Sequence, residues 1–581
     1  MSSATTPARL PLAGVLRLGR PSDIWFKPAL SAVAAAGPPN LTLLALGRLD
    51  LAVYTMAGSL CALYAHNRPY AARARALAWV VLGMVGGLAV ALVAASLTTD
   101  PVVLVTVGAL MAAVHKTLCD ATRIGPPGNV ILTFISSASL FAPQTLGQTP
   151  GHVGLALAAG ALAWLVGMAP GLLRPHGPER RATAHALHTA ADYAAADYAA
   201  ADYAAAGGTG DGHTAARAAT AAAVQSAWQS LLSTGAPTDR TRRALERLVV
   251  RAEVALAAPA DADPDQLRAW ARGLRGTGRV PRAGLPAAAE EELLGVAAES
   301  AAPHRPLRRR LAPLAPLAVR TALGCALAGY ASLALGVGRP YWALVTAAAL
   351  YQANIALTWR RGIQRVVGNL VGVLVFAAVE PVAHLHPLAL VLCCLACTFG
   401  AEALMGRNYW LGSVCVTPMA LLITEFTRTQ DSAELITDRV LDTVVGALVG
   451  FAAAVVVTNR RAGDRVEQAL TAVERAREHA ARLLAEPRPA PRDLETARRA
   501  LAGALADLRA TVDAASGEWW QRALPQERVV LAERSGHRTL AATVRHQGPH
   551  AGTAPSAEQP AGRPRAVPQA RTTATTEDGR P

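Results

Sequence analysis

The chain has 581 residues, of which 52% are hydrophobic and only 17% are charged, and its formal net charge is +15. Soluble domains average about 25% charged residues, so this composition argues against a soluble globular protein. The positive balance does not indicate a nucleic acid partner, because nearly all of the basic residues are arginines in the loops and soluble helices expected beside a membrane. Basic residues in such places keep loops on the cytoplasmic side of a membrane and attract anionic lipid.

Charge is segregated along the chain. Residues 175–312 and 459–581 hold most of it. Five stretches hold no Asp, Glu, Lys or Arg at all: 76–99, 130–149, 321–338, 340–358 and 443–458. A charge at bilayer depth costs about 2.5–3.5 kcal/mol on insertion scales. The pattern therefore predicts an all-α integral membrane protein in which membrane regions alternate with aqueous regions.

The N-terminal part predicts a short cytoplasmic segment, 1–22, and a first transmembrane half, 23–173. Residues 1–22 are polar and basic, which predicts no signal peptide. About 20 apolar residues cross a bilayer as a helix, and six spans are expected near 28–46, 50–66, 76–98, 101–116, 127–146 and 152–172. The first span contains Gly37-Pro38-Pro39-Asn40, which predicts a broken helix.

The middle of the chain, 174–313, predicts a cytoplasmic helical domain. Its Ala-, Arg- and Leu-rich sequence favours amphipathic helices at 218–235, 239–258, 262–276 and 285–300. The repeat Ala-Asp-Tyr-Ala-Ala over 191–205 has a five-residue period that fits neither a 3.6-residue stripe nor a heptad. We interpret it as a low-complexity extension of a surface helix.

The C-terminal part predicts a second transmembrane half at 314–458, cytoplasmic helices at 459–547 and a disordered tail at 548–581. Six further spans are expected near 315–337, 341–357, 363–379, 386–405, 408–425 and 438–458. Twelve spans are expected in all, and ten or eleven stay open. After them, 461–486 and 492–516 predict a helical hairpin broken by prolines, and 517–546 predicts another helix.

The two halves match each other in order. The corresponding positions are Lys27 and Arg320 in the first span, Gly83 and Gly87 with Gly368 and Gly372 in the third, and Gly167 and Gly171 with Gly446 and Gly450 in the last. Their separations fall steadily, from 293 to 285 to 279 residues. Such glycine pairs are helix-packing positions in membranes. The preserved order predicts a parallel repeat of two six-helix halves with a pseudo-twofold axis along the membrane normal.

Loop charges predict the orientation. With both termini in the cytoplasm, nine basic loop residues lie inside and four lie outside. The four outer residues are Arg48, Arg339, Arg428 and Arg439. The expected location is the cell membrane, in a multi-pass arrangement with both large soluble regions inside.

The second half resembles a known family. The stretches Arg339-Pro-Tyr-Trp-Ala-Leu-Val-Thr and Arg365-Val-Val-Gly-Asn-Leu-Val-Gly372 are similar to the central motif of fusaric acid resistance (FUSC) and aromatic acid exporter proteins. Further family positions are Asn408-Tyr409-Trp410, Thr417-Pro418 and Arg439-x-x-Asp442-Thr443-x-x-Gly446. The resemblance covers both halves, is strongest over 315–458, and says little about 175–312. Asn369 stands where the family usually has Thr.

The resemblance implies export of small organic anions, particularly aromatic carboxylates, from the cytoplasm. Two alternatives stay open: a passive organic-anion channel, and a non-transporting scaffold whose cytoplasmic helices bind a protein partner. The expected partners are bilayer lipids and a small organic anion, with a homodimer left open.

Polar residues at membrane depth usually face a cavity or a partner, and cations there attract carboxylates. The candidates for a substrate path are Lys27, Arg320, Tyr351, Gln352, Asn354, Arg365 and Asn369. In the alternative reading, the cations snorkel to headgroups or set topology, and the amides form interhelical hydrogen bonds. Glu402 and Glu425 are candidates for proton coupling, whereas His384 and His386 are interpreted as solvated loop residues.

Motifs of enzymes and ATPases are missing from the sequence. It has no P-loop, no His-Glu-x-x-His zinc motif and no Gly-x-Ser-x-Gly elbow. Cys394-x-x-Cys397 lies in an apolar run and is interpreted as packing between helices. We expect no enzymatic activity, no cofactor and no metal, so uphill transport would depend on an ion gradient.

Overall fold

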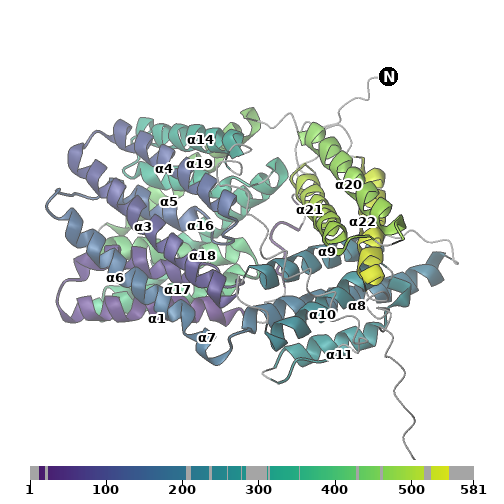
Figure 1. The fold of residues 1–581 in the computed structure, drawn as a ribbon. Helices are drawn as coiled ribbons and strands as arrows, with labels where there is room; N and C mark the ends of the chain where they lie inside the picture. Colours follow the sequence, from purple (N-terminus) through teal and green to yellow (C-terminus); the bar gives the residue numbers. More distant parts are fainter. Residues whose placement is uncertain are drawn as a thin grey trace, which may run out of the picture.

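The structure, a computed structural model, consists of helices and connecting loops throughout the residues that it describes (Figure 1). These are residues 12, 14–19, 24–204, 211–233, 239–257, 259–276, 278–282, 311, 314–352, 354–426, 431–457, 462–487, 489–515 and 525–547. The prediction of an all-α protein is confirmed. The helix expected at 285–300 and the tail at 548–581 lie outside the described residues.

The helices of the first half follow the predicted spans. They are α1 (Phe26–Ala45), η1 (Leu49–Leu51) with α2 (Ala52–Ser59) and η2 (Leu60–Leu63), α3 (Tyr70–Leu97), α4 (Pro101–Thr122), α5 (Val130–Leu140), and α6 (Thr149–Met168) with α7 (Pro170–Leu173). The start of α4 shows why. The Asp100 side chain accepts a hydrogen bond from the Val102 N–H at 2.8 Å, and Pro101 occupies the first helical position.

The second half has the same layout. Its helices are α14 (Ala315–Ala334), α15 (Pro340–Leu350), α16 (Ile355–Ala383), α17 (Pro387–Met405), α18 (Tyr409–Glu425) and α19 (Ser432–Val456). Across the described residues, seven helices are long and apolar enough to cross a membrane: α3, α4, α6 with α7, α14, α16, α17 and α19. The chain is therefore a multi-pass membrane protein.

Four apolar helices are shorter than a bilayer: the α2 segment, α5, α15 and α18. The 11 residues of α15 span about 16 Å, against about 30 Å for the hydrocarbon core. Every residue of α15 is buried, and the chain continues without helix through Tyr351 and Asn354, which are also buried. Non-helical backbone at membrane depth is tolerated only inside protein or beside a cavity.

Corresponding helices of the two halves make corresponding contacts. The helix α1 packs on α17 as α14 packs on α4, α2 packs on α6 as α15 packs on α19, and α3 packs on α5 as α16 packs on α18. This pattern supports the predicted pseudo-twofold repeat, which stays a prediction.

The predicted break in the first span is wrong. The helix α1 is continuous and contains both Pro38 and Pro39. A proline removes the N–H that would bond the carbonyl four residues earlier, which for Pro39 is Ala35. The Ser59 hydroxyl donates to that carbonyl at 2.9 Å, so a side chain of the neighbouring segment replaces the missing bond.

Most of the predicted packing glycines lie at close helix contacts. A Cβ on Gly446 would lie 2.5 Å from the Ala343 carbonyl oxygen, and one on Gly368 would lie 2.5 Å from that of Trp410. A Cβ would also meet atoms of a neighbouring helix within 4 Å at Gly87, Gly372 and Gly450. For Gly83 the prediction is wrong, because it is exposed and a Cβ there would meet no described atom within 4 Å.

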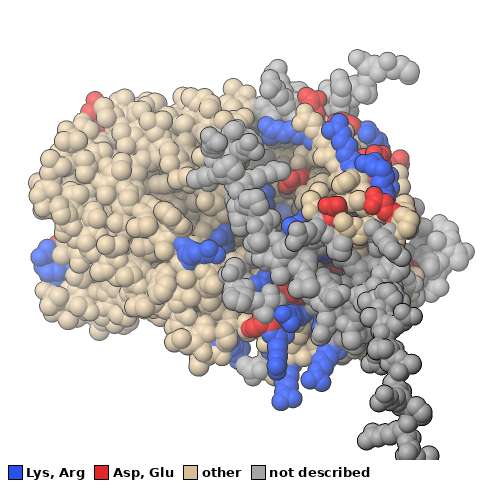
Figure 2. Space-filling model, in the orientation of Figure 1, with Lys and Arg blue, Asp and Glu red and all other residues tan. Residues whose placement is uncertain are grey.

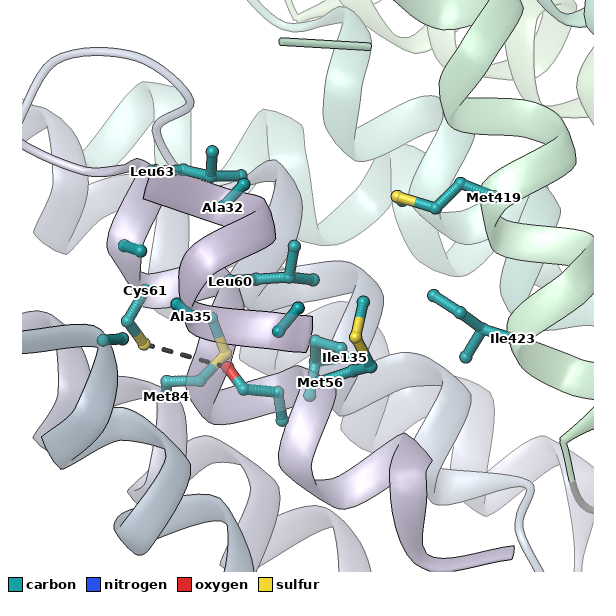
Figure 3. Close-up of a cluster of buried hydrophobic side chains, with 14 of the residues drawn as sticks. Ala32, Ala35, Met56, Leu60, Cys61, Leu63, Met84, Ile135, Met419 and Ile423 are labelled. Carbon is teal, nitrogen blue, oxygen red and sulfur yellow. Dashed lines mark hydrogen bonds between the residues drawn. The ribbon is translucent and has the colours of Figure 1, made fainter. Parts of the chain in front are cut away.

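An apolar core joins the two halves. Figure 3 shows Ala32, Met56 and Leu60 of the first half clustered together, with Met419 and Ile423 of α18 across from them. Small residues such as alanine let these helices approach closely.

The soluble helices form one end of the molecule, to the right in Figure 1. They are α8 (Gly177–Ala204), α9 (Asp211–Leu232), α10 (Arg240–Ala257), η3 (Pro259–Asp261), α11 (Pro264–Leu274), α20 (Ala462–Ala485), α21 (Pro491–Ala515) and α22 (Gln526–Gln547). A buried ion pair of 3.3 Å between Arg217 and Glu533 joins α9 to α22. The first unit of the Ala-Asp-Tyr repeat is not on the surface as predicted, because Tyr193 is buried.

The distribution of charge separates these two parts. On the face shown in Figure 2, Lys, Arg, Asp and Glu gather over the soluble helices, while the membrane region is almost entirely uncharged. This surface matches lipid contact for the membrane helices.

Candidate functional site

A line of buried polar side chains runs between α16, α18 and α19 of the second half, and we call it the polar column. It consists of Arg365 and Asn369 on α16, Thr417 on α18, and Arg439 and Thr443 on α19. All five are at most 3% exposed. Such groups are costly inside a membrane protein unless they meet partners or line a path.

Asn369 lies at the centre of the polar column. Its amide accepts a hydrogen bond from the Thr417 hydroxyl at 2.8 Å and donates one to Thr443 at 3.0 Å. Both threonines also donate to a carbonyl within their own helix. The Asn369 side chain thus links three helices by hydrogen bonds. This is the interhelical role that the sequence analysis gave as the alternative to a place on the substrate path.

Arg365 lies one turn from Asn369 on α16. Its Nη1 donates to the Tyr409 hydroxyl at 2.9 Å. Its Nε has no hydrogen-bond partner, and the guanidinium has no ion pair, among the residues that the structure describes. Arg365 is therefore a buried cation held by a single neutral partner.

Arg439 is the second buried cation. It lies close enough to Arg365 for the two charges to repel each other, and its guanidinium is 5.0 Å from the ring centroid of Trp342. Within the described part of the chain, neither its Nε nor its Nη1 finds an acceptor, and it forms no ion pair. The sequence analysis counted Arg439 among the loop residues. It is not in a loop, because it lies within α19 and only 2% of it is exposed.

A basic pocket lies next to the polar column, at the N-terminal ends of α16 and α18. It has a volume of about 360 Å³ and is lined by Arg17, Gly19, Gln352, Leu357, Arg360, Arg361, Gln364, Arg407, Asn408 and Tyr409. The described lining thus has four arginines and no carboxylate. Tyr409 joins the pocket to the polar column, because its hydroxyl binds Arg365 and its ring lies 3.7 Å from the Arg361 guanidinium.

A short N-terminal stretch, residues 14–19, lies against this pocket. The Asn408 amide donates to the Val15 and Arg17 carbonyls at 3.2 and 2.9 Å, and Gln364 donates to Val15 at 2.9 Å. These bonds place Arg17 in the pocket wall, so the N-terminal segment completes the basic site.

Charged side chains lie at the other end of the polar column. Arg339 and Asp438 form an ion pair of 3.2 Å there. The Ser332 hydroxyl donates to Asp442 at 2.5 Å, and the other Asp442 oxygen has no partner in the described chain.

A chain of carboxylates and a histidine lies at the same end of the polar column. His384 bridges Glu380 at 3.0 Å and Glu425 at 3.2 Å, and Ser432 donates to Glu380 at 3.0 Å. The Glu425 side chain is fully buried whereas His384 is partly exposed. His384 is therefore not the solvated loop residue of the sequence analysis, because it connects a buried carboxylate to the surface.

The remaining predicted positions are placed as follows. Gln352 lines the basic pocket. Asn354 caps α16 by accepting from the Leu357 N–H at 2.9 Å, which favours a structural role. Arg320 is buried beside Tyr351 and is not part of the pocket lining, and its Nε and Nη1 lack partners in the described residues. Lys27 lies in the first half, where it donates to Tyr70.

Glu402 lies on α17 outside the polar column, partly buried, and none of the described groups forms a hydrogen bond with it. Over the same residues there is no group of three His, Cys, Asp or Glu side chains that could hold a metal ion.

The first half lacks the polar column. With the separations of 285 and 279 residues given by the glycine pairs, the positions that correspond to Arg365, Asn369, Arg439 and Asp442 are Val80, Met84, Gly160 and Ala163. The halves therefore share their packing but not this chemistry.

Residues 326–453 match the fusaric acid resistance protein-like family. The matched region begins in α14 and ends in α19, so it includes the whole polar column. The resemblance noted in the sequence is thus confirmed for this FUSC-like region, and it indicates a membrane transporter. No curated protein and no solved structure matches the chain.

Sequence reasoning missed part of the site in the FUSC-like region. Arg439, Asp442, Thr417 and Tyr409 were noted there only as family positions. Their place in the resembling motifs was the one available signal, since no periodicity shows which face of a membrane helix turns toward a path.

Proposed function

We propose that the chain exports small organic anions, with aromatic carboxylates as the leading class, from the cytoplasm through its second membrane half. The observation that supports this most is the pair of buried arginines, Arg365 and Arg439: Nε of both, and Nη1 of Arg439, have no hydrogen-bond acceptor among the described residues. Neither guanidinium forms an ion pair there, although Asp442 lies close enough to attract Arg439. A buried donor without a partner costs about 1–3 kcal/mol. A carboxylate in transit would satisfy two N–H groups of one guanidinium at once.

The basic pocket would supply the entrance. Four arginines in a concave site raise the local concentration of anions, and Tyr409 leads from the pocket to Arg365. Further along, the fully buried Trp342 lies within 5.0–5.4 Å of the guanidinium groups of Arg439 and Arg339. This combination of an aromatic face and cations favours a substrate that carries both a ring and a carboxylate.

Glu425 and His384 would supply proton coupling. A buried carboxylate joined by hydrogen bonds to a partly exposed histidine gives a proton a way between the outer surface and the protein interior. Inward proton flow could then drive outward anion flow, with both termini and the basic pocket on the cytoplasmic side. In this arrangement the residues 174–313 and 459–547 form cytoplasmic domains.

The test is efflux of labelled benzoate, hydroxybenzoate and picolinate from cells that produce the chain. We expect Arg365→Gln and Arg439→Gln to lower efflux at least tenfold. Arg48→Gln is the matched control, because Arg48 is exposed and pairs with Asp50 in the loop after α1; it should leave efflux unchanged. Equal efflux in all three variants, with normal membrane insertion, would contradict the proposed path.

An uncoupler separates an exporter from a passive channel. Active export should collapse when the proton gradient is removed, and Glu425→Gln should abolish the gradient-driven part while sparing downhill exchange. Efflux that depends on Arg365 but is unchanged by the uncoupler would instead favour the channel. A loss of phenotype only on deletion of 175–312 would favour the scaffold.

A further inference from the structure

Four basic side chains gather at the end of the first half that faces the soluble helices, and none of them belongs to the path proposed above. They are Lys27 on α1, Arg73 on α3, Arg174 after α7 and Arg181 on α8, and we call them the first-half basic cluster. Lys27 Nζ donates to the Tyr70 hydroxyl at 3.3 Å. The three arginines lie close enough to Lys27 to repel it.

Arg73 is the most deeply buried member of the cluster, at 2% exposure. Its Nη2 lies 3.2 Å from His66 Nδ1, and His66 Nε2 lies 3.0 Å from the Ala62 carbonyl oxygen. A carbonyl oxygen only accepts, so Nε2 carries the imidazole proton and Nδ1 accepts from Arg73. His66 is therefore neutral and leaves the positive charge of Arg73 uncompensated.

The cluster has too little negative charge around it. Glu179 is the acid that the structure places near Tyr70 alongside these arginines, and it is itself buried. Four cations thus face one carboxylate among the described neighbours. In the same described region, Arg73 Nε and Arg181 Nη2 have no acceptor. The missing partner of such a site is an anion.

A large apolar cavity adjoins the cluster. It has a volume of about 730 Å³, lies between α6 with α7 and the soluble helices α8 to α10, and includes Tyr70 and Glu179 in its wall. Most of the remaining wall is aliphatic or aromatic: Trp164, Leu165, Met168, Leu172, Leu231 and Leu245. Three polar wall residues already have partners: His176 contacts Asp239 at 3.1 Å, and Arg242 pairs with Glu246 at 3.0 Å.

The cavity reaches the surface where the membrane region ends. Leu172 and Leu173 of α7 are 88% and 86% exposed, which is compatible with contact to acyl chains at the edge of the bilayer. The ring of Tyr70 packs on Gly171, where a Cβ would lie 2.9 Å from it, so this glycine lets Tyr70 stand between the cavity and the cations.

We propose that the first-half basic cluster and this cavity form a binding site for an anionic phospholipid of the adjacent leaflet. The phosphate binds Lys27, Arg73, Arg174 and Arg181. The part of an acyl chain next to the headgroup lies in the cavity against Trp164. Basic pockets between membrane helices bind anionic headgroups in this way. The lipid links α3 and α7 to α8, and thereby joins the first half to the soluble helices. The site does not depend on the proposed transport function.

The experiment uses the full chain, purified in detergent and stripped of lipid. It is titrated with phosphatidylglycerol and, separately, with phosphatidylcholine, and bound lipid is counted by native mass spectrometry. We expect tighter binding of phosphatidylglycerol. Arg174→Gln and Arg181→Gln should each weaken it about fivefold, since each cation near a headgroup contributes comparably. Arg268→Gln on α11 is the matched control and should change nothing.

A second measurement locates the lipid. Phosphatidylglycerol with brominated chains should quench the tryptophan fluorescence of the wild type more than that of Trp164→Phe. Arg174 is exposed, so the Arg174→Gln variant should fold normally. This is checked by comparing its thermal unfolding with that of the wild type, both without lipid. Equal affinity for phosphatidylcholine, unchanged phosphatidylglycerol affinity in both variants, or quenching indifferent to Trp164→Phe would overturn the proposal. Displacement of the lipid by equimolar glycerol phosphate would also overturn it, because the site would then recognise free phosphate.

Discussion

Replacement of Arg439 by methionine separates a transport role from a structural one, because the two roles predict opposite changes in stability. Methionine keeps the unbranched length of the side chain but removes the charge and the N–H donors. If Arg439 waits for a transient anion, the empty protein should be at least as stable without it. If Arg439 holds the fold through fixed partners, its loss should destabilise the protein.

The magnitude follows from its contacts. Two donors without acceptors in the described chain, Nε and Nη1, each cost about 1–3 kcal/mol. The contact with Trp342 at 5.0 Å returns about 2 kcal/mol in a desolvated site. Asp442 lies close enough to attract Arg439, and the loss of this attraction offsets part of the gain. We therefore expect Arg439→Met to leave the anion-free protein at least as stable, with a gain of up to about 2 kcal/mol, and to abolish anion efflux.

The assay is thermal unfolding in detergent, with and without benzoate, alongside efflux from cells. Arg339→Met is the matched control: Arg339 also lies beside Trp342 but pairs with Asp438 at 3.2 Å. Its removal leaves a partly buried carboxylate without this partner and should destabilise the protein by about 1–3 kcal/mol. Benzoate should stabilise the wild type and not Arg439→Met. Destabilisation of Arg439→Met by more than about 2 kcal/mol would refute the reasoning.

Three further predictions concern the packing and the soluble helices. Asn369→Leu should lower stability in detergent by about 1–2 kcal/mol, since it removes two interhelical hydrogen bonds worth about 0.6–1 kcal/mol each, whereas Asn369→Thr should lose about half as much; equal losses would contradict this. Gly446→Ala should destabilise by about 1–3 kcal/mol through overpacking and reduce folded yield, while Gly83→Ala, with open space around it, should be neutral or slightly stabilising; the same yield from both would be contrary evidence. Burial, reinforced by the charge of Arg217, lowers the pKa of His537 to about 4 from its ordinary 6.5. The unfolded state therefore binds the extra proton first, so the stability of α22 is complete above pH 6.5 and falls as the pH drops from 6.5 toward 4, by at most about 3 kcal/mol. Hydrogen exchange in α22, corrected for its intrinsic pH dependence, should show this loss in the wild type and not in His537→Gln; a pH response shared by both would rule it out.

Much of the fold was predictable because helices that cross a membrane need long apolar segments with few charges, and such segments are easily recognised in a sequence. Every predicted span coincides with a helix or a helical segment, since runs of about 20 apolar residues have few other solutions. The break at Pro38 failed for a specific reason. The rule treats a proline as a lost hydrogen bond. The Ser59 hydroxyl replaces the bond lost at Pro39 by donating to the Ala35 carbonyl, 24 residues away in sequence, and no local pattern encodes that contact.

The site was less predictable, because it depends on which face of a helix turns inward. Arg365 and Asn369 were found from their depth in an apolar run. Arg439 was counted as a loop residue because it stands at the very start of the expected span 438–458. Only the structure shows that it is buried. Asn354 was included as a path residue, although its local position as a helix cap explains its burial.

The difference between the halves argues that a single path crosses the protein. Packing positions are kept in both: Gly167 and Gly446 each face a neighbouring helix closely enough that a Cβ would collide. Chemistry is not kept, because Val80 and Gly160 stand where the second half has Arg365 and Arg439. A second path through the first half would expose an anion to apolar walls with no compensating donor at these positions, at a cost of several kcal/mol. The first half is then best understood as the rigid partner against which the second half is held. The two halves are held together at the contacts of α1 with α17 and of α4 with α14.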